Sequence, residues 1–209
     1  ALPAARPGAS AAHPDVQVLP AMSRRSLLGA AGASLLLSAC GGGTDDDVSW
    51  VRFLNASVAY GSLDCYLEGT RHVQSLAYGA VSGYVELDAG TYTTAFKRAG
   101  ASTTLLSADR GFSADTHYTV VTYGWDGALK SALLTDEEDA PDTGSVKLRV
   151  FNTSTDAGSV DLLLGDPGAD IADANVVASG VAGGTAISYV EVGTGTWALS
   201  VTGNADRAD

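Results

Sequence analysis

Few side chains in this 209-residue sequence have the types and the spacing that catalysis or metal binding requires. After the first forty residues the only histidines are His72 and His117, and neither has a second His, Cys or Glu at the spacing of a zinc site. No G-x-S-x-G segment is present to expose a serine nucleophile on a strand-to-helix turn. We therefore predict a protein that is not an enzyme and needs no cofactor. Carboxylates brought together by the fold remain a further alternative.

Three aspartates are weak candidates for calcium. Asp64 and Asp161 occupy matching places in an internal repeat and lie opposite the predicted core face, while Asp156 lies in a loop before Asp161. Calcium takes about six to eight oxygen ligands, and the sequence offers no set of six that we can name. Apart from these weak candidates we predict no metal site.

Residues 193–198, GTGTWA, fit the G-x-G-x-x-A pattern of dinucleotide-binding proteins. In those proteins a helix follows at once, so that its N-terminus can bind the pyrophosphate. Here the following residues have the character of a strand, and the repeat aligns the segment with a turn at residues 88–91. We therefore predict a hairpin turn and no nucleotide site.

The elements that position these residues follow from the internal repeat. Residues 52–68 return as residues 149–165, an offset of 149 − 52 = 97, with seven of seventeen positions identical. Alternate side chains of a strand share one face, so Cys65 takes the place of Leu162 and is predicted to be core. Residues 84–92 return as residues 189–197, an offset of 189 − 84 = 105, with the extra residues in a loop near 165–173.

Short β-prone segments separated by Gly, Asp and Ser predict an all-β fold of two tandem β-sandwich domains. In the first copy we expect strands near residues 49–55, 62–68, 72–78, 83–88, 91–98, 103–108, 116–123 and 128–134. Residues 117–123 suit a central strand, while residues 88–91 and 108–111 have turn chemistry. At the second offset Asp209 corresponds to Thr104, so we expect the second domain to be incomplete at its C-terminus.

Composition predicts the domain boundaries. The first sandwich is expected at residues 49–135 and the second at residues 145–209. The acidic segment with Pro and Gly between them, residues 136–144, is predicted to be a solvated linker. Residues 40–48, which begin with CGGGTDDD, are predicted to be a flexible tether.

The leader has the basic, apolar and small order of a secretory signal. Arg24 and Arg25 precede an apolar run of eleven residues, too short to span a bilayer, which is closed by Leu37, Ser38, Ala39 and Cys40. This closing segment resembles the lipobox of bacterial lipoproteins. The resemblance implies that residues 22–39 are a signal peptide and that Cys40 carries the lipid. The alternative is a buried hydrophobic helix that ends in an ordinary cysteine.

Gly41 follows the cysteine, which in lipoproteins of double-membrane bacteria implies the outer membrane, on its periplasmic or its surface face. The two arginines also resemble a twin-arginine signal, so export by the general secretory route and by the twin-arginine route both stay open. Residues 1–21 are rich in Ala and Pro and precede Met22. We interpret them as upstream sequence or as a disordered extension.

Without residues 1–39 the chain carries nine basic and twenty-three acidic residues, a net charge of 9 − 23 = −14. A chain this acidic, with no basic patch, repels nucleic acid, so we predict no nucleic-acid partner. Cys65 is the one thiol left after acylation of Cys40, and no intramolecular disulfide is expected.

Both copies resemble DUF4397, a family of bacterial exported domains of unknown function. The resemblance rests on VRFLNAS at residues 51–57, LDCYLEG at 63–69, AYGAVSGY at 77–84 and AGTY at 89–92. It implies an immunoglobulin-like β-sandwich and no activity. Asn55 and Asn152 stand where the family has histidine, and we predict that each forms an Asn-x-Ser turn after the first strand of its copy.

These observations lead to the hypothesis of a non-catalytic, lipid-anchored envelope protein whose sandwiches serve adhesion, spacing or ligand binding. Tyr66, Tyr78 and Tyr84 are weak candidates for an aromatic surface that binds protein or carbohydrate, although tyrosines also pack inside sandwiches. The alternative is a periplasm-facing accessory subunit of an envelope enzyme or transport assembly.

Overall fold

The computed structural model describes residues 47–136 and 139–203. Strands dominate these ranges, and the one helical element they contain is the short 3-10 turn η1 (Ile171–Asp173). The predicted all-β fold is therefore confirmed. No helix in the described ranges has the length and hydrophobicity needed to cross a bilayer. The predicted upstream segment, signal peptide and lipobox with Cys40, and most of the tether, lie outside the described residues.

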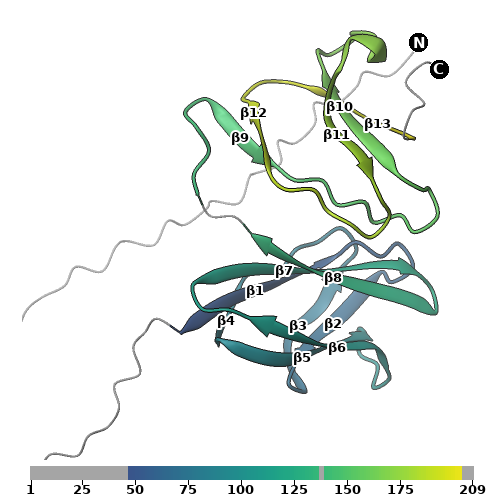
Figure 1. Ribbon diagram of the computed structural model, residues 1–209. Helices are drawn as coiled ribbons and strands as arrows, with labels where there is room; N and C mark the ends of the chain where they lie inside the picture. The colour runs from purple at the N-terminus through teal and green to yellow at the C-terminus, as the bar shows by residue number, and fades with distance from the viewer. Residues whose placement is uncertain (1–46, 137–138, 204–209) are drawn as a thin grey trace, which may run out of the picture. The chain divides into compact units, whose positions relative to one another are not determined.

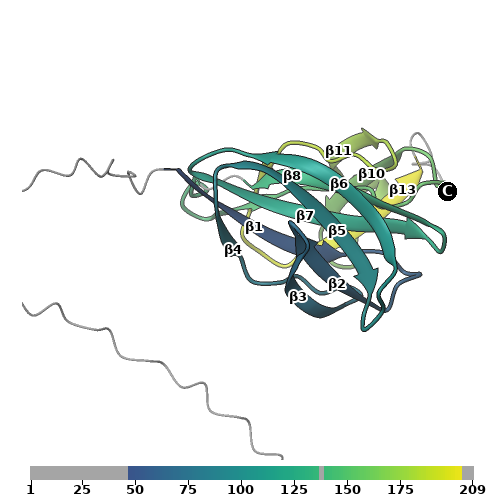
Figure 2. The same ribbon diagram turned by 90° about the horizontal axis from the view of Figure 1, so that it is seen from below.

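The first half of the chain forms two four-stranded sheets that lie face to face (Figure 1; Figure 2). One sheet has the order β4-β1-β7-β8, from β1 (Val48–Asn55), β4 (Val85–Asp88), β7 (Thr116–Trp125) and β8 (Ala128–Asp136). The other has the order β3-β2-β5-β6, from β2 (Ser62–Leu67), β3 (Thr70–Ala77), β5 (Gly90–Arg98) and β6 (Thr104–Phe112). All eight strands expected from the sequence are present, and β1 pairs parallel with β7.

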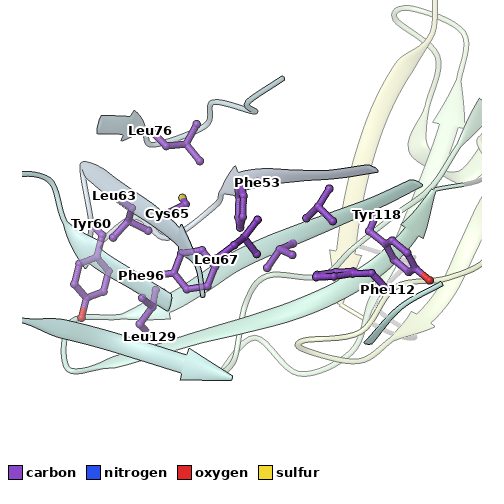
Figure 3. Packing of buried hydrophobic residues seen from close by; sticks show 12 residues of the cluster. Phe53, Tyr60, Leu63, Cys65, Leu67, Leu76, Phe96, Phe112, Tyr118 and Leu129 are labelled. Atoms are coloured by element: carbon purple, nitrogen blue, oxygen red, sulfur yellow. The ribbon is translucent and has the colours of Figure 1, made fainter. Parts of the chain in front are cut away.

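Alternating burial along β1 shows why the two sheets pack. Val51 and Phe53 point inward and are fully buried, whereas Arg52 between them faces outward. The rings of Phe53 and Phe96 meet edge to face across the two sheets, with centroids 5.9 Å apart (Figure 3). Each fully buried side chain of this size stabilises the fold by about 1.5–3 kcal/mol.

Cys65 lies in this core with no exposed surface, as its alignment with Leu162 predicts. Burial, followed by the nearby charge of Asp64, raises the pKa of its thiol to about 12. The thiol therefore stays protonated at neutral pH, as expected of a packing residue.

Strand β7 runs between β1 and β8 and is buried on both faces from Tyr118 to Tyr123. The composition of residues 117–123 predicted such a central strand, and the structure confirms it. Its neighbour β8 continues as far as Asp136, so the predicted linker at residues 136–144 begins one residue too early. That one residue carries the charge around which the candidate site is built.

The prediction of a turn at residues 108–111 is wrong. These residues belong to β6 and pair with β5 without interruption from Ala108 to Phe112. Arg110 faces the sandwich interior, where its Nε donates to Thr94 Oγ1 at 3.0 Å and its Nη2 donates to Ser131 Oγ. Cross-strand contacts of the side chain thus override the local turn preference of an Asp-Arg-Gly sequence.

The second half repeats the arrangement of β1–β5. Its strands are β9 (Ser145–Leu148), β10 (Val160–Gly165), β11 (Asn175–Val181), β12 (Val190–Gly193) and β13 (Ala198–Gly203). They form the sheets β11-β10-β13 and β12-β9, with the same antiparallel pairings as β3-β2-β5 and β4-β1. Residues 145–203 contain no counterpart of β6, β7 or β8.

The GTGTWA segment connects β12 to β13, so the element that follows it directly is a strand and not a helix. The segment is thus part of the passage between two strands. The connection is not a hairpin, however, because β12 and β13 belong to different sheets. Residues 88–91 make the same change of sheet between β4 and β5.

Candidate functional site

A group of polar side chains on the β4-β1-β7-β8 sheet surrounds Asp136. We name Asp136, Arg52, Thr119 and Tyr84 the Asp136 cluster. Arg52 on β1 and Thr119 on β7 are register partners, and β8 places Asp136 beside them at its last position. The side chain of Asp136 is only 7% exposed, although the residues that follow it in the sequence are mostly acidic or turn-forming.

The Asp136 carboxylate contacts every other member of the cluster, accepting hydrogen bonds from two hydroxyls and forming an ion pair with Arg52. Its Oδ2 accepts from Thr119 Oγ1 at 2.6 Å and from Tyr84 Oη at 2.8 Å, and it pairs with Arg52 Nη2 at 3.2 Å. Its Oδ1 accepts from Arg149 Nη2 at 2.9 Å. Arg52 also donates from Nε to Thr119 Oγ1 at 2.8 Å, which fixes the hydroxyl proton toward Asp136. Two arginines and two hydroxyls therefore compensate one buried negative charge.

Tyr84 is a neutral donor in this cluster. Burial, and then the hydrogen bond to Asp136, raise the pKa of its phenol to about 12. The guanidinium of Arg52 lies over its ring at 4.8 Å. Arg149 lies over Tyr189 at 4.5 Å in the same way, and the repeat aligns these two residues with Arg52 and Tyr84. The arginine–tyrosine pair is therefore part of the repeated architecture.

An aromatic stack continues the cluster along the sheet. The rings of Trp50 and His117 are stacked with centroids 4.4 Å apart and 17° between their planes. Tyr84 meets His117 edge to face at 4.8 Å. One of the two histidines considered for metal binding thus packs between aromatic rings. Across the described ranges no three His, Cys, Asp or Glu side chains come together to hold a metal ion.

The aspartates considered for calcium have a structural role in both halves. Asp64 is 1% exposed, and its Oδ1 accepts from the backbone N–H of Ser75 at 2.8 Å. Asp161 is equally buried, and its Oδ1 accepts from Gly180 N–H at 2.7 Å. Ser75 and Gly180 align in the repeat, and both have left-handed backbones, with φ of 53° and 64°. Each aspartate therefore holds an irregular point in the neighbouring strand.

The contacts of Asp64 also determine its protonation state. Burial alone opposes ionisation, but hydrogen bonds from the N–H groups of Ser75 and Gly100, together with Arg71, outweigh it and lower the pKa of the carboxyl group. Asp156, the third calcium candidate, lies in an exposed loop, where its Oδ1 and Ser154 Oγ are 3.0 Å apart. Asp64 and Asp161 belong to sheets in different halves, so the structure gives them no common ligand shell.

Asn55 and Asn152 form the predicted Asn-x-Ser turns. Asn55 Nδ2 donates to the carbonyls of Tyr60 and Leu76 at 2.9 and 3.1 Å, and its Oδ1 accepts from Ser57 N–H at 3.1 Å. Asn152 makes the same three kinds of bond, to the carbonyls of Gly158 and Val181 and from Ser154 N–H, at 3.0–3.1 Å. Both amides thus tie the loop after the first strand to the neighbouring strand.

The three candidate tyrosines do not share one surface. Tyr66 is half-buried on the outer face of the β3-β2-β5-β6 sheet, with Lys97 Nζ 4.5 Å above its ring. Tyr84, which is 40% exposed, packs on Arg52 at the outer face of the other sheet. Tyr78 follows β3 and is 54% exposed. Tyr84 alone belongs to a polar cluster, and its partner Asp136 was not among the sequence candidates.

Two four-stranded sheets packed face to face define a β-sandwich protein, and sequence comparison assigns its family. Residues 49–163, more than half of the chain, match the family model DUF4397, a domain of unknown function. The chain therefore belongs to the DUF4397 family. It is also similar to the solved N-terminal domain of AlgF from P. aeruginosa, at 22% identity over 44% of this chain and 95% of that chain, with a TM-score of 0.33. No curated protein matches the chain.

Proposed function

We propose that this chain is a non-catalytic, lipid-anchored protein of the bacterial cell envelope whose tandem β-sandwiches serve adhesion, spacing or ligand binding. The observation that carries the proposal is the Asp136 cluster. Its buried carboxylate is engaged by two arginines and two hydroxyls, with its side chain 7% exposed. A carboxylate bonded in this way stabilises a scaffold and is poorly placed to accept a proton from a substrate.

Three contacts shared by the two halves support the tandem arrangement. The asparagine turns, the aspartate-held irregular strands and the arginine–tyrosine pairs recur at aligned positions. The changes of sheet at residues 88–91 and 193–198 support an immunoglobulin-like connectivity, in which the chain crosses repeatedly from one sheet to the other. We propose two tandem DUF4397-like domains on this basis.

The sequence supports the anchor. Arg24 and Arg25, the apolar run and the closing segment that ends at Cys40 have the order of a lipoprotein signal. Several acyl chains on one cysteine give stable membrane attachment. The protein would then meet the outer membrane through its lipid, while its acidic domains have no attraction for nucleic acid or for the anionic lipid surface.

Detergent phase partitioning and labelled-palmitate incorporation test the anchor. We expect wild-type protein to incorporate label and to enter the detergent phase, and the Cys40→Ser variant to do neither. Protease treatment of intact cells then distinguishes the two functional candidates. Digestion supports adhesion or ligand binding at the surface, whereas full protection favours the alternative of a periplasm-facing accessory subunit. Unlabelled wild-type protein in the aqueous phase would refute the lipoprotein assignment.

A further inference from the structure

A small pocket of about 170 Å³ lies where three loops meet. Its lining consists of Ala56, Val58, Gly124, Trp125, Thr153, Ser154 and Thr155. Residues 56–58 follow β1, residues 124–125 end β7, and residues 153–155 are the repeat equivalents of residues 56–58. We name it the loop-end pocket. None of the residues singled out from the sequence as a candidate site residue lines it.

The first-half wall of the loop-end pocket is rigid. Ser57 Oγ donates to the Gly124 carbonyl at 2.7 Å, and Ala56 N–H donates to the Thr122 carbonyl at 2.8 Å. Beyond Trp125, the β7–β8 turn is held by Gly127 N–H, which donates to the buried Tyr60 hydroxyl at 3.0 Å. These bonds fix the backbone of the first-half wall before any ligand arrives.

Two large apolar side chains in the lining of the loop-end pocket are exposed to solvent. Trp125 is 51% exposed and Val58 is 58% exposed. An exposed tryptophan beside an exposed valine forms an apolar platform that internal packing does not account for. The indole face is also the aromatic surface with the strongest electrostatic character.

The rest of the lining is polar but uncharged. Hydroxyl groups come from Thr153, Ser154 and Thr155, and no Asp, Glu, Lys or Arg side chain contributes to the lining. The hydroxyl of Ser154 is engaged within its own loop, because its Oγ accepts a hydrogen bond from Ala157 N–H at 3.1 Å and bonds with Asp156. The threonine hydroxyls therefore supply the polar contacts. In a chain with a net charge of −12, an uncharged pocket selects a neutral ligand.

We infer that the loop-end pocket binds one ring of a neutral carbohydrate. The apolar face of a sugar ring would stack on the indole of Trp125, and its hydroxyls would bond to Thr153 and Thr155. The volume is below that of pockets for drug-sized ligands and suits a single ring of a longer polymer. This inference deepens the ligand-binding role proposed above, and it does not depend on the lipid anchor.

Isothermal titration of the purified full chain tests the inference. The probes are neutral oligosaccharides (cellopentaose, maltopentaose and chitopentaose), with oligogalacturonate as the charged comparison. We expect a neutral probe to bind with a dissociation constant on the order of 1 mM or tighter. Trp125→Ala should weaken that binding by at least about tenfold, because it removes the stacking surface. Trp125→Phe should lose less, since it keeps an aromatic face.

Trp197→Ala is the matched control. Trp197 is 41% exposed, but its Nε1 donates to the Gly193 carbonyl at 2.9 Å and it does not line the pocket, so its loss should leave binding unchanged. The inference is overturned if no neutral probe binds, if oligogalacturonate binds in place of the neutral probes, or if Trp125→Ala binds as wild type does. Phase partitioning tests the lipid anchor and titration tests carbohydrate binding, so the failure of one proposal can be distinguished from the failure of the other.

Discussion

Removal of the Asp136 carboxylate should destabilise the first sandwich strongly. In Asp136→Ala the two hydroxyl donors lose their acceptor, and Arg52 and Arg149 lose the charge that compensates them. Breaking a fully buried ion pair costs about 3–5 kcal/mol. The Arg52 side chain is 33% exposed and regains water, so the upper end of that range does not apply. We expect a loss of about 2–4 kcal/mol in the free energy of unfolding.

Urea denaturation followed by circular dichroism measures this loss, and the chain supplies its own control. Asp126 pairs with Arg98, but the two side chains are 72% and 48% exposed. Asp126→Ala should therefore change the free energy of unfolding by less than about 1 kcal/mol. If Asp136→Ala costs no more than Asp126→Ala, the Asp136 cluster does not stabilise the fold and our account of it is wrong.

The same substitution should lower the pKa of Tyr84. In the wild type, burial and then the hydrogen bond from Tyr84 to Asp136 raise this pKa from 10.0 to about 12. A raised phenol pKa contributes stability that is present below the unfolded value and is lost as the pH rises through about 12. Without Asp136 the burial effect persists, but the charged acceptor is gone and Arg52 favours the phenolate. Carbon-13 tyrosine NMR should show the fall, and an unchanged Tyr84 pKa in Asp136→Ala would contradict the assigned cause.

Three further predictions concern the first sandwich. Asn55→Ala should cost about 2–4 kcal/mol in urea denaturation, because it leaves two buried carbonyls without donors; a loss below about 1 kcal/mol would refute the turn-holding role. Gly124→Ala should cost about 1–3 kcal/mol and lower the melting temperature, since φ is 101° and the added Cβ would lie 2.6 Å from the Ala128 carbonyl oxygen; wild-type stability would show that the hairpin adapts. In a Cys40→Ser chain the remaining thiol, Cys65, should react with a disulfide reagent only after unfolding, because burial raises its pKa to about 12; rapid reaction of the folded chain would contradict its place in the core.

The strands of the first sandwich could be predicted because their side chains alternate. Leu63, Cys65 and Leu67 share a face, and the repeat supplies a second, more apolar version of that face in Val160, Leu162 and Leu164. Because both copies of the repeat show the same alternation of apolar residues, together they predict a strand more strongly than either copy does alone. The same comparison assigned Cys65 to the core and predicted a turn at the GTGTWA segment, although it did not predict that the chain changes sheet there.

Contacts between distant strands could not be predicted in this way. Asp136 lies in an Asp-Glu-Glu-Asp run, and no local feature of the sequence distinguishes the one carboxylate that reaches Arg52 and Thr119 from the acidic residues that follow it. Arg110 was assigned to a turn for the same reason. Its partners Thr94 and Ser131 belong to strands β5 and β8, which only the folded sandwich brings to it. In both cases residues remote in sequence decide the structure.

The two halves also separate structural contacts from functional ones. Asn55 and Asn152, and Asp64 and Asp161, keep their bonds while most of the sequence around them has changed, so the fold itself requires those bonds. Trp125 lies on β7, which has no counterpart in residues 145–203, and Val58 is matched by the polar Thr155. A binding function specific to this chain is best sought where the halves differ. The loop-end pocket, formed from two unlike versions of one loop around Trp125, is the described site that meets this criterion with exposed apolar surface.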